Sequence, residues 1–343
     1  MTEENKLITE RKKKLDEIKK KYKPYPNSFK KVHTTDIIIS KYSNYEKESL
    51  VEDAVDVSVS GRLLTIRNMG NSSFANLHDE NGNIQIYLQK KQVGDDAYWL
   101  FNNLDLGDIV GISGKLFKTK TGELTINTEN IELLSKSLRP LPEKFHGISD
   151  IEIKYRQRYL DLMINPETKK LFKIRSKIIS SIRNYFINDN YLEVETPMMH
   201  MIPGGAAAKP FITHHNSLDL DLYLRIAPEL FLKRCIIGGY EKVFEINRSF
   251  RNEGLSVKHN PEFTMIEFYC AYENYLYLMK LIEDLFQGLI EKLDFNLKFN
   301  YQEQEIDFKT PFLKVKFYDA IEKYAIDIDM SKVNDKSYLM SYC

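Results

Sequence analysis

The sequence predicts an α+β protein with two domains, a small β-barrel followed by an antiparallel sheet with flanking helices. Three observations predict it. The chain has 343 residues, enough for two cores. Apolar residues alternate with a period of two from about Val55, and helical patterns interleave with strands beyond Asn165. The predicted segments are a basic helix with its lead-in at 1–54, the barrel at 55–136, a linker at 137–155 and the second domain at 156–343.

The composition is that of an ordinary globular protein. It is 43% hydrophobic, and 49 Lys and Arg residues balance 49 Asp and Glu residues. No run of about 18 apolar residues occurs, and the first residues form no apolar signal segment, so we expect a cytoplasmic protein without a membrane span. The cysteines, Cys235, Cys270 and Cys343, are widely spaced and lack metal-ligand patterns, which favours reduced thiols.

The amino-terminal segment is strongly basic. Residues 1–31 contain eleven basic and five acidic side chains, and residues 3–21 have the spacing of a charged amphipathic helix. Two interpretations stay open. The lysines form a solvated helix face, or they contact a nucleic acid that the next domain binds.

The first domain is predicted to be a five-stranded barrel. Turn signals such as ENGN and KTG separate its strands, and a helical segment lies near residues 94–103. This pattern suits a Greek-key barrel of the OB type, although other small barrels fit it too, and OB barrels commonly bind single-stranded nucleic acid on one strand face. The predicted strands are 55–67, 72–79, 82–89, 107–119 and 122–134.

Phe74 is the candidate stacking platform on this barrel. It lies among small and polar neighbours, which is unusual for a core position, and Arg67 and Gln85 are nearby candidates for contacts to phosphate and base. The alternative is that Phe74 fills the barrel interior.

The second domain is predicted to begin with a helix. Pro166 suits the first helical position after Asn165, and Asp189 with Asn190 ends the helical pattern. The next strand, YLEVETPMM, contains Pro197, which cannot donate a ladder hydrogen bond and therefore suits a strand end or an interface edge.

The hairpin of residues 240–272 carries the side chains that indicate chemistry. Its apolar residues alternate with a polar set that includes Arg251 and Glu253, so one face is core and the other is a candidate site. An arginine fork suits carboxylate or phosphate, a glutamate accepts from an exocyclic amine, and Phe263 stacks on a flat ring. A purine nucleotide satisfies all three, with His259 within reach of a distal phosphate.

Glu267 lies on the same predicted face, between aromatic residues. A buried carboxylate without a partner costs several kcal/mol, so Glu267 indicates a pocket for a cation. Glu229, in the upstream run RIAPELFLKR, adds a second carboxylate. The alternative is a surface hairpin whose arginine and glutamates pair with one another.

With these residues in place, the sequence resembles the class II aminoacyl-tRNA synthetases, and among them the bacterial type of lysyl-tRNA synthetase, carboxy-terminally truncated. YLEVETP resembles the first motif of that family, which builds the dimer interface around Pro197. FRNEG followed by HNPEFTMIEFY resembles its second motif. PGGAAAKPF and LDLDLYLRIAPELFLKR are similar to segments that are specific to the lysine enzymes of the family. The resemblance covers residues 55–280, including the barrel, which corresponds to the family's anticodon-binding domain.

The resemblance implies a lysine–tRNA ligase that uses ATP and Mg²⁺ to form lysyl-adenylate and then transfers lysine to the 3′ end of tRNA(Lys). It implies a homodimer and assigns residues to four ligands. Arg251, Glu253, His259 and Phe263 would bind ATP, and Arg251 would also be the catalytic residue. Gly205, Glu229, Arg251, Glu267 and Tyr269 would bind lysine. Arg67, Phe74, Gln85 and Glu123 would bind the anticodon.

The chain also departs from the family pattern. The third motif, a GxGxxR pattern, is absent, because Gly288 is the only glycine after Gly254. The glutamates that hold Mg²⁺ in the family would lie beyond Cys343, so the sequence predicts no metal ligands here. We therefore expect a weakly active or inactive chain, with a noncatalytic tRNA-binding module as the alternative. Aspartyl- and asparaginyl-tRNA synthetases share the first two motifs, but PGGAAAKPF and Glu267 argue against their substrates.

Overall fold

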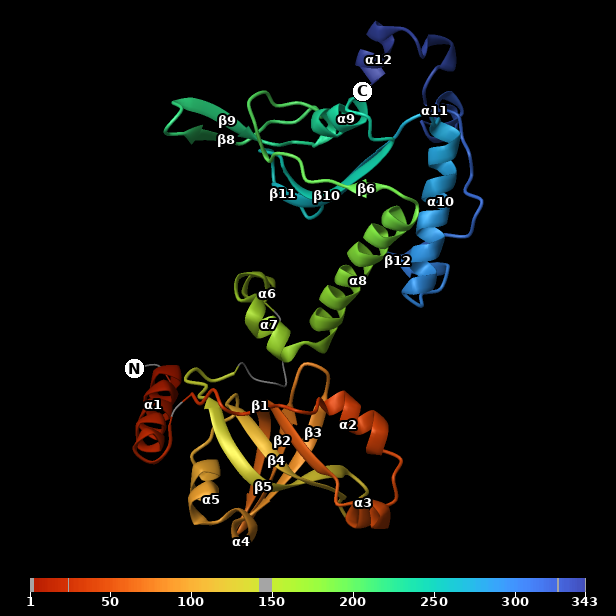
Figure 1. Cartoon of the computed structure of the whole chain (residues 1–343). Helices are drawn as coiled ribbons and strands as arrows, with labels where there is room; N and C mark the ends of the chain where they lie inside the picture. Colours follow the sequence, from red (N-terminus) through yellow and green to blue (C-terminus); the bar gives the residue numbers. More distant parts are fainter. Residues whose placement is uncertain (1–2, 24, 142–149, 326, 343) are drawn as a thin grey trace. The chain divides into compact units, whose positions relative to one another are not determined.

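The computed structural model describes residues 3–23, 25–141, 150–325 and 327–342. The chain divides into two compact units, Met1–Pro166 and Glu167–Cys343, and Figure 1 labels most of their elements. Part of the predicted linker, residues 142–149, lies outside the described residues, as does Cys343. In the parts of the chain that the structure describes, no helix is both long enough and apolar enough to cross a membrane.

The first unit is built on a closed barrel with the strand order β1-β2-β3-β5-β4, in which β3 and β5 are parallel. All five predicted strands are present. They are β1 (Asp56–Met69), β2 (Ser72–His78), β3 (Asn83–Gln89), β4 (Ile109–Lys118) and β5 (Leu124–Ser135). The helices of this unit are α1 (Glu3–Lys21), α2 (Thr35–Tyr42), α3 (Lys47–Asp53), α4 (Lys90–Val93), α5 (Asp95–Asn102), α6 (Ile151–Arg156) and α7 (Arg158–Ile164).

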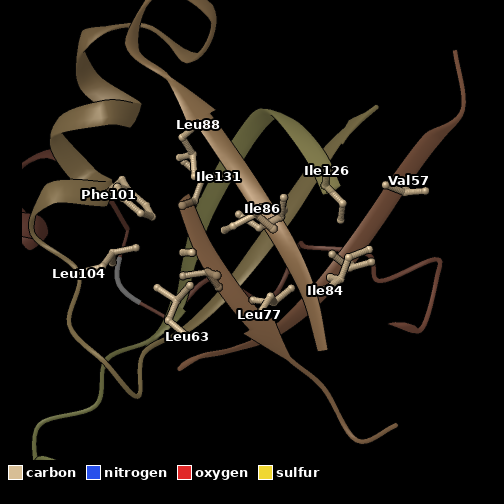
Figure 2. Packing of buried hydrophobic residues seen from close by; sticks show 14 of the residues in the cluster. Val57, Leu63, Leu77, Ile84, Ile86, Leu88, Phe101, Leu104, Ile126 and Ile131 are labelled. Atoms are coloured by element: carbon tan, nitrogen blue, oxygen red, sulfur yellow. The ribbon is translucent and has the colours of Figure 1, made fainter. Parts of the chain in front are cut away.

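Strand alternation places the apolar side chains inside the barrel. Leu77, Ile86 and Ile126 are fully buried, and Figure 2 shows side chains from different strands meeting in this interior. Helices cover the barrel with further members of the same cluster, Ile18 from α1 and Phe101 from α5. The predicted amphipathic character of the amino-terminal helix is therefore confirmed.

The second unit has an antiparallel hairpin at its centre. The hairpin strands are part of a sheet of order β11-β10-β6, beside a second sheet of order β7-β9-β8 and a small β12-β13 hairpin. The strands are β6 (Leu192–Glu193), β7 (Met199–His200), β8 (Ile212–His215), β9 (Leu220–Leu224), β10 (Lys242–Phe250), β11 (Glu262–Cys270), β12 (Lys298–Tyr301) and β13 (Gln304–Asp307). The helices are α8 (Pro166–Asn188), α9 (Glu229–Ile237), α10 (Tyr275–Lys292), α11 (Phe317–Tyr324), a 3₁₀ turn (Met330–Lys332) and α12 (Lys336–Tyr342).

One face of this hairpin packs on α8 and α10. The Phe186 ring lies 5.2 Å from that of Phe244 and 4.7 Å from that of Phe268, and Leu281 and Leu285 complete the cluster. Burying such rings stabilises the contact by area and by aromatic pairing. The predicted division of the hairpin into a core face and a polar face is confirmed.

Candidate functional site

The polar face of the hairpin is defined by the register of β10 and β11. Glu245 lies opposite Glu267, and Ser249 lies opposite Phe263. Directly opposite residues of an antiparallel pair share a face, so these four side chains lie on the side away from the α8 and α10 core. The β10 residues of this set are buried, whereas Phe263 and Glu267 are half-buried and accessible to a ligand.

Arg251 and Phe263 form one end of the site. The backbone hydrogen bonds between the two strands extend one residue beyond β10, where the Arg251 amide donates to the Pro261 carbonyl at 2.8 Å. The guanidinium carbon of Arg251 lies 5.1 Å from the centre of the Phe263 ring. Its Nε is buried and has no hydrogen-bond partner among the described residues. Such a donor costs about 1–3 kcal/mol when left unpaired, so this end suits an anionic acceptor.

Glu253 and His259 lie farther out, in the exposed loop between the strands. The His259 Nδ1 is 2.8 Å from the Ser256 hydroxyl, which ties the imidazole to its own loop. The structure brings Arg251 and Phe263 together but does not show Glu253 or His259 in contact with them. Their assignment to adenine and γ-phosphate stays a prediction.

The other end of the site is acidic. The Tyr269 hydroxyl donates to Glu267 Oε1 at 2.7 Å. Glu229 begins α9, and its Oε1 accepts from the Lys233 ammonium, also at 2.7 Å. That ammonium lies 5.8 Å from the centre of the Tyr269 ring. Two carboxylates, a phenol and an ammonium therefore share one region of the molecule.

Gly205 lies against this acidic end for a steric reason. Its φ of +88° is a conformation that favours glycine, and a Cβ built there would lie 2.9 Å from the Glu229 Cβ. The absence of a side chain lets the backbone of the PGGAAAKPF segment approach Glu229. The predicted neighbourhood of Gly205 and Glu229 is thus present.

The electrostatics of the acidic end favour a cationic ligand. Burial raises the pKa of Glu267, and the negative charge of Glu229 raises it further, whereas the Tyr269 hydrogen bond and the Lys233 charge oppose the shift. Burial and the bond to Glu267 likewise raise the pKa of Tyr269, which keeps the phenol protonated as a donor. An added ammonium would relieve the repulsion between the two carboxylates.

A buried ion pair holds Glu245 of the polar face in place. Arg225 Nη1 lies 2.6 Å from Glu245 Oε1, and the two side chains are 2% and 4% exposed. The Thr196 hydroxyl donates to Glu245 Oε2 at 2.7 Å, and Arg225 Nε donates to the Arg248 carbonyl at 2.8 Å. This network joins the segment between β6 and β7, through Thr196, to the middle of the hairpin.

The barrel presents a separate aromatic surface. Phe74 lies opposite Arg67 on one side and Tyr87 on the other. The Phe74 and Tyr87 rings stack at 4.5 Å, and the Phe117 ring lies 6.0 Å from Tyr87. The interpretation of Phe74 as a filler of the barrel interior is wrong, because its chain neighbours are the buried residues of β2 and Phe74 itself is only partly covered.

Gln85 and Glu123 lie on the same barrel, and the structure brings them together. Gln85 Nε2 donates to Glu123 Oε2 at 3.0 Å, while its Oε1 accepts from the Thr125 hydroxyl at 2.9 Å. The amide is therefore held in one orientation, which is the condition for reading the edge of a base. The assignment of Gln85 and Glu123 to the anticodon stays a prediction.

Sequence reasoning did not single out three residues of these surfaces. Lys233 follows Glu229 by four residues on a helix, a spacing that predicts an ion pair. Tyr87 lies on β3, which pairs with β2, and Phe117 lies on β4 farther round the barrel, so recognising that they gather beside Phe74 requires the strand order. The described residues include no group of three or more His, Cys, Asp or Glu side chains that could hold a metal ion.

Comparisons with known proteins agree with this arrangement. The family model for tRNA synthetases class II (D, K and N) matches residues 150–340, and that for the OB-fold nucleic acid binding domain matches residues 57–134. A lysine–tRNA ligase of Nitrosomonas europaea is 50% identical over 98% of this chain and 67% of its own length. The chain belongs to the lysine–tRNA ligase family of class II tRNA synthetases.

Other lysine–tRNA ligases show the same extent of similarity. That of Legionella pneumophila is 52% identical over 95% of this chain and 66% of its own length, and that of Methylobacillus flagellatus is 49% identical over 98% and 66%. The chain spans about two thirds of the length of these curated relatives. Membership in the lysine–tRNA ligase family confirms the predicted fold, an OB barrel followed by an antiparallel sheet with helices.

Proposed function

We propose that this chain binds L-lysine and ATP on the polar face of the β10–β11 hairpin, as the activation site of a lysine–tRNA ligase. The Lys233 ammonium carries the proposal, because it is bound to Glu229 and lies over Tyr269 in the structure. Lys233 shows that the acidic end accepts a lysine ammonium, and its recorded ion pair is with Glu229, so the terminal ammonium of a free lysine matches the chemistry beside Glu267. Glu229 and the Gly205 backbone would take the α-amino group, and Glu267 with Tyr269 the ε-ammonium.

The proposed reaction is attack of a lysine carboxylate oxygen on the α-phosphorus of ATP, with pyrophosphate as the leaving group. Arg251 would hold the carboxylate and α-phosphate together and neutralise charge in the transition state, while Phe263 would stack on adenine. Glu253 would accept from the adenine amine, and His259 would meet the γ-phosphate. Catalysis then depends on orientation and electrostatic stabilisation, without a covalent enzyme intermediate. Mg²⁺ is expected with the nucleotide, and none of these residue roles depends on it.

The barrel is proposed to bind the anticodon of tRNA(Lys) through Arg67, Phe74, Gln85 and Glu123, in the cytoplasm. A homodimer formed around Pro197 is proposed from an exposed apolar surface. Met198, Met199 and Ile202 are 44%, 55% and 77% exposed. Contiguous apolar residues of this kind mark protein interfaces.

Lysine binding is expected to weaken as the pH falls. Glu267 binds an ammonium only when ionised, and its pKa lies above the ordinary 4.5 in the free protein. The lysine affinity should be constant above this raised pKa and fall by about tenfold per pH unit below it, because a proton competes with the ammonium. Calorimetric titration of the whole chain with lysine between pH 4.5 and 8 measures this.

Norleucine, which lacks the ammonium, is the control ligand for that titration. Norleucine should bind more weakly than lysine at pH 7.5. Its affinity should not fall as Glu267 becomes protonated. Equal affinities for the two amino acids at pH 7.5 would contradict the proposed lysine site. Binding of tRNA without any binding of lysine would instead support a noncatalytic tRNA-binding module.

Replacement of Phe74 by alanine should weaken tRNA binding by about 1–3 kcal/mol, the range measured for base–aromatic stacking. The substitution removes a half-buried ring from the outer face, so the barrel interior is left intact. Filter binding of tRNA(Lys) at fixed salt measures the effect. Tyr25→Ala is the control, because Tyr25 is an exposed aromatic residue whose loss should leave tRNA affinity unchanged. Phe29→Ala is unsuitable as a control, because Phe29 packs over Gly111. An unchanged affinity for Phe74→Ala would count against the anticodon assignment.

A further inference from the structure

The barrel has a groove of about 670 Å³ next to the aromatic surface. The β1–β2 turn, with Met69 and Asn71, forms one wall, and the α4 segment, with Lys90 and Lys91, forms another. Tyr87 lines this groove and also stacks on Phe74. The groove and the stacking platform are therefore continuous through one side chain.

The strand register explains this continuity. Phe74 pairs with Tyr87, and Ser72 pairs with Gln89 two residues farther along the same strands. Residues two apart on a strand share a face and lie about 7 Å apart. A nucleic-acid strand with one base on Phe74 and Tyr87 would thus meet Ser72 and Gln89 at its adjoining nucleotide.

The walls of the groove are held in place by hydrogen bonds. The Tyr98 hydroxyl of α5 donates to the Gly70 carbonyl at 2.8 Å, and the Lys90 amide donates to the Asn71 carbonyl at 2.9 Å. Gln89 Nε2 donates to the Tyr87 hydroxyl at 2.7 Å. The side-chain oxygen of Gln89, Oε1, can then accept a hydrogen bond from a ligand. The groove is preorganised, so a ligand would not need to order this part of the backbone.

The two lysines of the groove differ in how far their charge is neutralised by a neighbouring carboxylate. The Lys90 ammonium lies 2.9 Å from Asp95 Oδ1, so much of its charge is compensated within the protein. Lys91 is exposed and lines the same groove. A flexible ammonium beside amide and hydroxyl groups suits a phosphate with its ribose, and Asp95 would oppose the phosphate.

We propose that this groove is a further nucleotide subsite, in which Lys91 binds the phosphate and Gln89 with Asn71 the ribose of the nucleotide adjoining the one stacked on Phe74. The inference rests on the proposed binding of single-stranded RNA by the barrel and extends it to residues beyond the predicted anticodon set. The ligand class is a ribose phosphate within an RNA strand.

The test is the binding of a seven-nucleotide oligouridylate to the full chain over a range of salt concentrations. Lys91→Ala should weaken binding about 3- to 10-fold and reduce the slope of log K against log salt by about 0.7, the value for one phosphate contact on a single strand. Asp95→Asn should strengthen binding, because it removes a negative charge that opposes the phosphate. A loss of folding would weaken binding and so cannot produce this result. Lys47→Ala, an exposed lysine of α3, is the matched control and should change neither quantity.

The outcomes separate this inference from the proposed function. If Phe74→Ala weakens binding but Lys91→Ala and Asp95→Asn have no effect, the subsite is wrong and the platform stands. If Phe74→Ala has no effect, the platform itself is wrong. An equal loss of slope in Lys91→Ala and Lys47→Ala would show a general charge effect and would overturn the subsite.

Discussion

Replacement of Arg225 by methionine is expected to lower the free energy of unfolding of the second unit by about 3–5 kcal/mol, the range for breaking a buried ion pair from one side. Glu245 is 4% exposed and would lose the guanidinium 2.6 Å away. The bond from Arg225 Nε to the Arg248 carbonyl would be lost as well. Amide hydrogen exchange of β10 and β11 measures the change. The fluorescence of Trp99, the chain's single tryptophan, reports the barrel separately.

Two further variants make this result interpretable. Arg225→Met combined with Glu245→Leu should recover most of the stability, because no unpaired charge then remains buried. Arg183→Met removes the partner of Glu193 in an ion pair whose side chains are 37% and 32% exposed, and it should cost no more than about 1 kcal/mol. Similar losses for Arg225→Met and Arg183→Met would show that burial of the first pair has no special importance.

Replacement of Glu267 by glutamine should have the largest effect on lysine binding. Loss of the carboxylate leaves the substrate ammonium in a half-buried site without its counter-charge, which should weaken binding by about 2–5 kcal/mol, roughly 30- to 4,000-fold. The affinity for norleucine should not fall in parallel, because norleucine has no ammonium at that position. Calorimetric titration of the variant with both amino acids measures the difference.

Glu262→Gln is the matched control, since Glu262 lies on the same strand and pairs with Arg248 in an exposed contact at 3.5 Å. It should leave lysine affinity unchanged. Tyr269→Phe removes only the hydrogen bond to Glu267 and should have a smaller effect, about 0.5–1.5 kcal/mol. Wild-type lysine affinity in Glu267→Gln would remove Glu267 from the proposed site.

Local patterns were sufficient to predict most of the elements. The period of two located the five barrel strands, and the helix at Pro166–Asn188 follows from its apolar spacing and terminal residues. The alternation in FEINRSF and TMIEFYC separated the core face of the hairpin from the polar face, because strand geometry depends on neighbouring residues alone. Family membership agrees with the motifs on that face.

Long-range packing decided which of these side chains meet. The Lys233 ammonium reaches Tyr269 only because α9 lies beside β11, and Arg225 pairs with Glu245 across 20 residues of sequence. The groove beside Tyr87 depends on the closed strand order and on the hydrogen bond from Tyr98 to the β1–β2 turn. By itself the sequence determined the elements and their polar faces, since these follow from local spacing. Only the tertiary structure decided the partners, because burial and charge pairing depend on segments that are distant along the chain.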